Sequence, residues 1–136
     1  MLTVVRSLAN AEAVAQWARS EGFADIVPRN WHVTLARTYE AVDLSMLRPD
    51  PTMLIVEASE DRVITRMGGI IALLFGSVAL AARHREFRDA GADWAHPNFR
   101  PHVTIAVDDR RDLGGIVAFA DDLVFGGEIW SLPGLG

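Results

Sequence analysis

The sequence His-Val-Thr-Leu-Ala at residues 32–36 returns almost unchanged as His-Val-Thr-Ile-Ala at residues 102–106. Side chains two positions apart on an extended strand point to the same side. In each copy, the histidine and the threonine therefore share one face, and the aliphatic residues between them face a core. Two such strands placed side by side would put two imidazoles across one cleft, which suits a general base and a general acid acting on the same bond.

The residues before the first copy predict a strand and then a helix. Residues 2–8 are predicted to form the strand, Asn10 can cap the helix, and Gly22 supplies its C-terminal end. His32 follows ten residues after Gly22.

The residues before the second copy repeat this order. Residues 70–75 form a short and wholly apolar stretch, Ser77 can cap a helix that runs towards Ala90, and Gly91 ends it. His102 follows eleven residues after Gly91. The matched order and spacing indicate an internal repeat of two β-α-β units rather than a longer array.

The length and the repeat together predict the domain organisation. A chain of 136 residues, 50% of them hydrophobic, suits a single domain over residues 1–136. We expect pseudo-symmetric units at about residues 1–40 and 68–108, a β-hairpin over residues 52–66 between them, and a last strand over residues 122–125. The expected fold is α+β and bilobal, with two outer helices and antiparallel sheets around a central cleft.

Charge limits the partners that the chain can bind. The formal net charge is −5, which disfavours a protein that holds long nucleic acid through its phosphates. A small anionic ligand in a local pocket is compatible with this charge. The basic residues are all arginines, so a phosphate site would have to be built from guanidinium groups.

The composition also limits the location and the metal chemistry. There is no cysteine, which excludes disulfides and thiolate zinc sites and is compatible with the cytoplasm. Residues 67–82 carry no charge, but they are interrupted by glycines and fall short of the roughly 20 apolar residues of a membrane span. The N-terminus lacks the features of a signal peptide. No histidine spacing typical of zinc occurs, so neither a metal nor another cofactor is expected.

Paired His-x-Thr motifs in two β-α-β lobes resemble the two-histidine phosphoesterase superfamily, whose bilobal fold is also called LigT-like. The run from Gly91 to Thr104, the preceding Arg83-His84 and the late stretch at residues 124–129 are similar to the anti-CBASS nuclease family of tailed phages. Versions of that family are appended to phage head and portal proteins. The resemblance implies metal-independent destruction of cyclic oligonucleotide signals of bacterial immunity, in the cytoplasm of the infected or prophage-carrying host.

The resemblance also implies roles for the motif residues. One of His32 and His102 would act as the base and the other as the acid, and the order stays open. Both protonation forms of an imidazole are accessible near pH 7, because its ordinary pKa is about 6.5. Thr34 and Thr104 would hold the non-bridging phosphate oxygens and stabilise the charge that develops in the transition state.

Further residues are expected to contact the substrate. Three aromatic residues are candidates for stacking on a base, and a late glutamate could accept hydrogen bonds from a base edge; they are Trp94, Phe99, Trp130 and Glu128. His84 is interpreted as a hydrogen-bonded structural residue of its helix, and His96 as a solvated loop residue.

Arg37 and Tyr39 are further candidates, but they depart from the family's order, in which the aromatic residue precedes the arginine. Strict alternation along a strand puts Arg37 and Tyr39 on the face opposite His32 and Thr34. Arg37 would then reach the cleft only where the strand ends or twists.

Three functions are compatible with the sequence. The first is hydrolysis of cyclic dinucleotides or trinucleotides to counter CBASS. The second is an enzyme acting on RNA ends, such as a 2′,3′-cyclic phosphodiesterase or a 2′-5′ RNA ligase-like protein. The third is a nucleotide-binding or phage structural module without turnover, against which the two intact motifs argue, because binding alone needs neither an acid nor a base.

Overall fold

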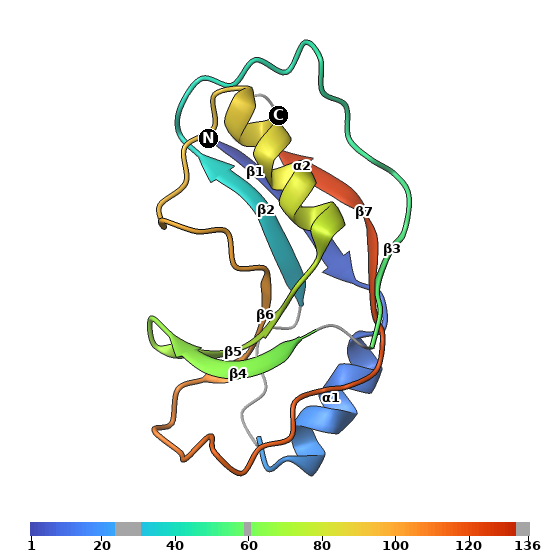
Figure 1. Cartoon of the computed structure of the whole chain (residues 1–136), viewed down its shortest axis with the longest axis vertical. Coiled ribbons are helices and arrows are strands. Elements are labelled where there is room, and N and C mark those ends of the chain that lie inside the picture. The colour runs from blue at the N-terminus through green and yellow to red at the C-terminus, as the bar shows by residue number, and fades with distance from the viewer. Residues whose placement is uncertain (24–30, 59–60, 133–136) are drawn as a thin grey trace.

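The computed structural model describes residues 1–23, 31–58 and 61–132. These residues form seven strands and two helices in an α+β arrangement (Figure 1). In chain order, the elements are β1 (Leu2–Leu8), α1 (Ala11–Ser20), β2 (His32–Thr38), β3 (Leu54–Val56), β4 (Arg62–Met67), β5 (Ile70–Phe75), α2 (Val78–Asp89), β6 (His102–Val107) and β7 (Leu123–Ser131).

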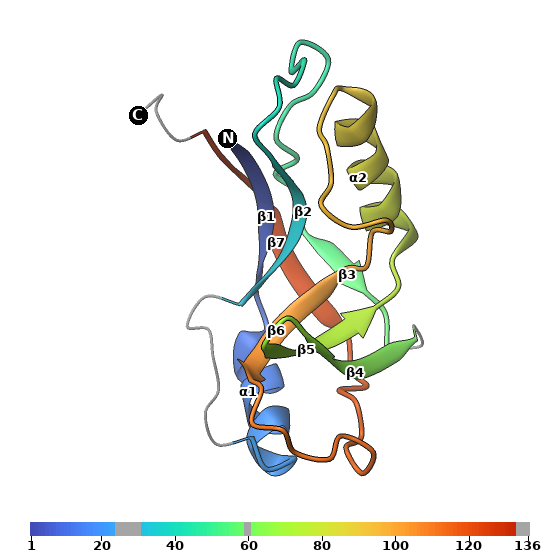
Figure 2. The same cartoon turned by 90° about the vertical axis from the view of Figure 1, so that its left-hand side faces the viewer.

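The strands form two antiparallel sheets, which Figure 2 shows one above the other. The first sheet has the order β2-β1-β7-β3, and the second has the order β4-β5-β6. The strand β2 is an edge of the first sheet and β6 is an edge of the second, and these two edge strands contact each other. The strands that carry the repeated motif therefore meet at the junction of the sheets.

The expected repeat is present as β1-α1-β2 and β5-α2-β6. In both units, the last residue of the first strand donates its backbone N–H to the residue that precedes the motif histidine. Leu8 N bonds Trp31 O at 2.8 Å, and Phe75 N bonds Pro101 O at 3.2 Å. The duplicated sequence thus produces duplicated backbone contacts.

Each helix follows a strand of one sheet and lies beside the other sheet. The helix α2 follows β5 of the lower sheet and packs on β2 of the upper one, whereas α1 follows β1 and lies beside the lower sheet (Figures 1 and 2). Buried side chains of both sheets and both helices form a single apolar cluster. In the described part of the chain, neither helix has the length and apolar character that crossing a membrane requires.

The two predicted helix caps differ in outcome. Ser77 is confirmed as the cap of α2, because its hydroxyl accepts a hydrogen bond from Leu80 N at 3.1 Å. Asn10 is confirmed as the N-cap residue of α1, but its side chain makes no capping hydrogen bond. Its amide instead pairs with the backbone entering β7, donating to Asp122 O at 2.7 Å and accepting from Val124 N at 3.0 Å.

The predicted hairpin over residues 52–66 is also wrong. Its two halves form strands in different sheets, since β3 pairs with β7 and β4 pairs with β5. The strand β4 forms its hairpin with β5, through a turn at Gly68 and Gly69. Their φ angles of 54° and 86° fit a two-residue turn that needs positive φ at both positions. In the sequence, these glycines were interpreted only as interruptions of an apolar run.

The strand β7 is longer than expected, because it continues beyond Phe125 to Ser131. A segment at Asp50 and Pro51 lies against its middle, where Glu128 N donates to Asp50 O at 2.7 Å. A Cβ atom at Gly127 would lie 2.8 Å from Pro51 O, so only glycine allows this close approach. The extension decides where Glu128 and Trp130 lie.

Candidate active site

The motif histidine and threonine share a face in both copies, as the sequence predicts. In β2, His32 and Thr34 are half-buried while Val33 is fully buried. In β6, His102 and Thr104 are half-buried on either side of buried Val103. Each pair therefore lies on the face of its strand that points away from the core.

Both motif strands contain a β-bulge at the same place. Val5 pairs with Thr34 and Val4 with Ala36, which leaves Leu35 as an extra residue in β2. In β6, Ala72 pairs with Thr104 and Ile71 with Ala106, which leaves Ile105 as the extra residue. Leu35, Ala36, Ile105 and Ala106 are all buried in consequence.

Because of the first bulge, Arg37 lies on the face of β2 opposite to the one expected from strict alternation. An extra residue reverses the alternation beyond it, so Arg37 is exposed on the face of Thr34, while Ala36 and Thr38 are buried. Strict alternation fails because an irregularity of the backbone lies between the motif and Arg37. By the same reversal, Val107 shares the face of Thr104 in β6.

A cavity with a volume of about 490 Å³ joins the two motifs. Thr34 of the first copy and His102 of the second both line it, as do Arg37, Tyr39 and Trp94. The remaining lining residues are Asp93, Ala95 and His96. Five residues predicted from the sequence are therefore brought together, while His32 and Thr104 lie on the same strand faces but do not line this cavity.

The orientation of the His102 ring is fixed by a backbone carbonyl. Nδ1 lies 2.8 Å from Arg100 O. A carbonyl oxygen can only accept a hydrogen bond, so Nδ1 carries a proton and donates it. Nε2 is then the ring atom available for proton transfer to a substrate.

Comparison with known proteins assigns the chain to a family. The family model of the anti-CBASS protein Acb1 matches residues 2–131. The chain belongs to the Acb1 family of anti-CBASS proteins.

Acb1 proteins of three organisms show this similarity. The Acb1 of Caulobacter sp. (strain RHG1) is 36% identical over 137 residues, and that of Sphingomonas paeninsulae is 31% identical over 140 residues. These alignments cover 95% and 96% of this chain but only 22% of each relative. The Acb1 of Escherichia phage RB16 is 31% identical over 112 residues, covering 79% of this chain and 63% of the phage protein.

In this Acb1-family chain, His84 is a buried structural residue, as interpreted from the sequence. Its Nδ1 donates to the carbonyl of the bulge residue Leu35 at 2.7 Å. Its ring stacks on Phe99 with centroids 4.2 Å apart and meets the edge of Trp94 at 4.7 Å. Burial is the main cause that lowers the pKa of His84; the Leu35 carbonyl opposes the shift, and the charge of Arg88 adds to it.

Glu128 and Trp130 lie on the other face of their sheet. Glu128 pairs with Arg6, which in turn pairs with buried Val33 of β2, so this face is opposite that of Thr34. The Glu128 carboxylate is fully buried under α2 and accepts hydrogen bonds from Arg83 at 2.7 and 2.9 Å.

The remaining acceptor capacity of Glu128 is also used within the protein. The carboxylate accepts from Asp50 N at 3.1 Å and from Trp130 Nε1 at 3.0 Å. Burial by itself raises the pKa of Glu128, but the bonds from Arg83, Asp50 and Trp130 outweigh it and leave this pKa below the ordinary value. Glu128 and Trp130 are therefore not part of the cavity that Thr34 and His102 line.

Asp93 and Arg100 were missed by the sequence reasoning. Asp93 lines the cavity and accepts a hydrogen bond from the hydroxyl of buried Thr38, at the end of β2. Arg100 lines a neighbouring cavity together with His102 and Trp94. Its position two residues before the motif histidine was a signal that could have found it. Phe99 does not line either cavity and packs on His84 instead.

Proposed function

We propose that this chain is a metal-independent phosphodiesterase that cleaves cyclic oligonucleotide messengers and so counters CBASS defence. The proposal assigns it to the two-histidine phosphoesterases with their LigT-like fold. The observation that carries it is the meeting of Thr34 and His102, from different motif copies, in one cavity. The family name supports the role against CBASS.

The first step uses both imidazoles on one phosphodiester. A neutral imidazole takes the proton of the ribose 2′-hydroxyl, whose oxygen attacks phosphorus. The 5′-oxygen leaves and takes a proton from the second, charged imidazole. The ring opens to a linear product that ends in a 2′,3′-cyclic phosphate.

The second step reverses the roles of the imidazoles. The imidazole that has lost its proton takes one from water, and the resulting hydroxide attacks the cyclic phosphate. The other imidazole returns its proton to the departing ribose oxygen. Thr34 and Thr104 donate hydrogen bonds to the non-bridging oxygens in both steps and stabilise the developing charge.

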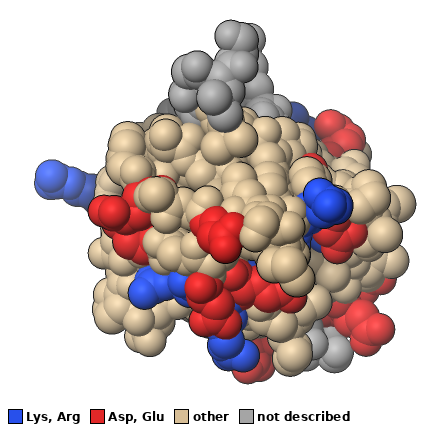
Figure 3. Space-filling view, turned by 90° about the horizontal axis from the view of Figure 1, so that it is seen from above, with Lys and Arg blue, Asp and Glu red and all other residues tan. Residues whose placement is uncertain are grey.

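The surroundings of the motif suit a compact anionic substrate. Arg37 supplies a guanidinium group at the cavity, and Trp94 supplies an indole face for a base. On the face seen from above in Figure 3, acidic groups are interspersed with arginines and no continuous basic surface is present. A local phosphate site therefore fits this chain better than a long nucleic acid.

The test is turnover of three substrates: 3′3′-cyclic GMP-AMP, a cyclic trinucleotide and an RNA with a 2′,3′-cyclic end, each with and without a chelator. We expect cleavage of at least one cyclic oligonucleotide at an unchanged rate in the chelator. His32→Ala and His102→Ala should each lower kcat by about 100-fold or more, since general acid–base catalysis contributes about 10²–10⁴-fold. Arg85→Gln, on the exposed side of α2, is the matched control.

Three results would overturn the proposal. Cleavage of the RNA end alone would favour the enzyme of RNA ends. Tight binding without turnover would favour a binding module. Loss of activity in the chelator, restored by a divalent metal, would contradict the two-histidine mechanism.

A further inference from the structure

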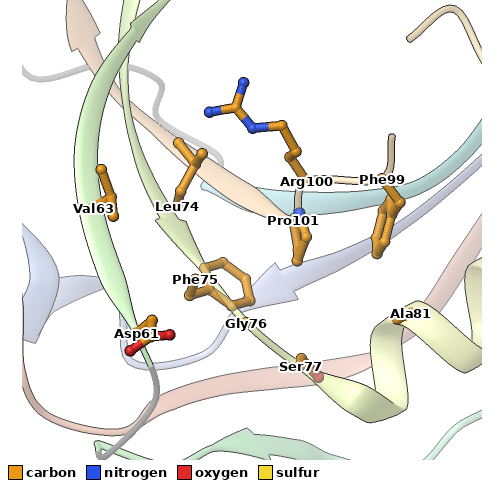
Figure 4. Close-up of a pocket in the computed structure, with 10 residues that line it drawn as sticks. All are labelled: Asp61, Val63, Leu74, Phe75, Gly76, Ser77, Ala81, Phe99, Arg100 and Pro101. Atoms are coloured by element: carbon orange, nitrogen blue, oxygen red, sulfur yellow. The ribbon is translucent and has the colours of Figure 1, made fainter. Parts of the chain in front are cut away.

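A third pocket, with a volume of about 360 Å³, lies where β4 and β5 approach the start of α2 (Figure 4). Val63 and Leu74 form one side of it, and Phe99 and Pro101 form the facing side. These walls are apolar and partly aromatic, as a flat heterocycle requires.

This pocket adjoins the proposed catalytic histidine. Leu74 and His102 are directly opposed partners on neighbouring antiparallel strands. Opposed side chains lie on the same face, with Cβ atoms about 5 Å apart. Arg100 lines both this pocket and the cavity that His102 lines. A ligand that reaches His102 can therefore extend past Arg100 into the apolar pocket.

Two charged side chains mark the opposite ends of the pocket. In Figure 4, the guanidinium of Arg100 lies beyond Leu74, and the carboxylate of Asp61 lies at the other end, near Phe75. Within the described ranges, neither side chain takes part in an ion pair. One end can thus bind a phosphate, and the other can accept N–H donors.

We propose that this pocket is a second base-binding subsite that favours guanine. The inference rests on the proposed function, because it supplies a place for another nucleotide of the same substrate. The base lies between the Val63–Leu74 side and Phe99–Pro101, and Arg100 holds the phosphate between the two subsites. Asp61 accepts the adjacent N1–H and N2–H donors, a pair that among the common bases only guanine offers.

The first test locates ligands directly, without relying on turnover. Protein with labelled Val and Leu methyl groups is titrated by NMR with GMP, AMP, guanosine and indole. We expect GMP to shift the methyl signals of Val63 and Leu74 and to bind about tenfold more tightly than AMP, as a bidentate base contact implies. No shift with GMP, or a shift with indole alone, would overturn the subsite.

The variants separate the two ends of the pocket. Arg100→Gln should weaken GMP and AMP about tenfold and leave guanosine unchanged, because only the nucleotides carry a phosphate. Asp61→Asn should reduce the preference for GMP over AMP to less than about twofold, because an amide pairs with adenine as well. Exposed Arg85→Gln and Asp89→Asn on α2 are the matched controls.

The two proposals fail in different ways. If wild-type protein does not cleave cyclic oligonucleotides while GMP still shifts the Val63 and Leu74 methyls, the proposed function is wrong and the subsite stands. If cleavage occurs and GMP leaves these methyls unmoved, the subsite is wrong. If the Asp61→Asn protein binds GMP as tightly as wild type does, and also binds AMP as tightly as wild type does, Asp61 does not select guanine and the proposed preference is wrong.

Discussion

Arg37 and Val107 occupy equivalent positions of the two repeats, one residue beyond the buried Ala36 and Ala106. Both are exposed on the motif face of their strands. Only Arg37 carries a charge, and only Arg37 lines the cavity with Thr34 and His102. The site is thus symmetric in its motif residues and asymmetric in its electrostatics. We infer that the substrate phosphate lies nearer to the first repeat.

Arg37→Gln tests this asymmetry. We expect kcat/KM for a cyclic dinucleotide to fall about 10- to 100-fold, because a hydrogen bond to a charged group contributes about 1.5–3 kcal/mol. Val107→Gln at the equivalent position should change it less than about twofold. Steady-state kinetics of both variants measures the difference, and equal losses would remove Arg37 from phosphate binding.

The sequence was sufficient for the motif faces but not for the residues beyond them. His32 with Thr34, and His102 with Thr104, follow from alternation over three residues. Arg37 could not be placed, because a single bulge residue reverses every later side chain. Glu128 could not be placed either, because its face depends on how β7 pairs with β1, a contact between residues far apart in the chain.

At the scale of elements, α2 contacts the first bulge through a hydrogen bond of His84. The imidazole donates to Leu35 O, and the same ring packs against Trp94 and Phe99 of the loop that leads to His102. One buried side chain therefore contacts both the strand of the first motif and the approach to the second. Its donor is Nδ1, and burial lowers the pKa of His84 below that of an exposed histidine.

His84 should make the stability of the fold depend on pH. With the folded pKa of His84 below the unfolded value of about 6.5, the unfolded chain binds more protons below pH 6.5, so stability is lost as the pH falls through that value. Urea unfolding of wild type and His84→Leu at several pH values between 7.5 and 5.5 measures this. At pH 7.5 the variant should be less stable by about 1–3 kcal/mol, because Leu35 O is left unpaired.

The prediction concerns the difference in the free energy of unfolding between wild type and His84→Leu. This difference should shrink as the pH falls from 7.5 to 5.5, because only wild type retains the imidazole. The aspartates and Glu128 with lowered pKa values act in a more acidic range and are common to both proteins. A difference that stays constant or grows towards pH 5.5 would contradict a buried, neutral His84.

The elements themselves were predictable where local signals decide them. The repeat with its two helices follows from the periodic apolar positions and the glycines at 22 and 91, whose φ angles of 90° and 116° are in the left-handed region. The hairpin was misassigned because β3 and β4 follow each other in the sequence but pair with β7 and β5 instead of with each other. Gly68-Gly69 joins β4 to β5 instead.

At the scale of the whole molecule, the crossed positions of the helices tie the two sheets together. The helix α2 belongs by sequence to the second repeat and packs on the first sheet, while α1 lies beside the second (Figures 1 and 2). Neither repeat buries its apolar side chains without the other, because a single cluster includes residues of both. We therefore expect the two repeats to unfold together, in agreement with the single domain that the length of the chain predicts.

Leu35→Ala and Ile105→Ala test this cooperation at equivalent sites. Both side chains are the extra residues of the two bulges, and both are fully buried. Each substitution should lower the free energy of unfolding by about 2–5 kcal/mol, the range for an aliphatic residue cut to alanine in a core.

Because both repeats share one core, each variant should unfold in a single transition, shifted as a whole to lower urea concentration. Far-UV circular dichroism and tryptophan fluorescence measure this together, and coincident curves are expected. Separate transitions for the two signals in either variant would show that the repeats unfold independently.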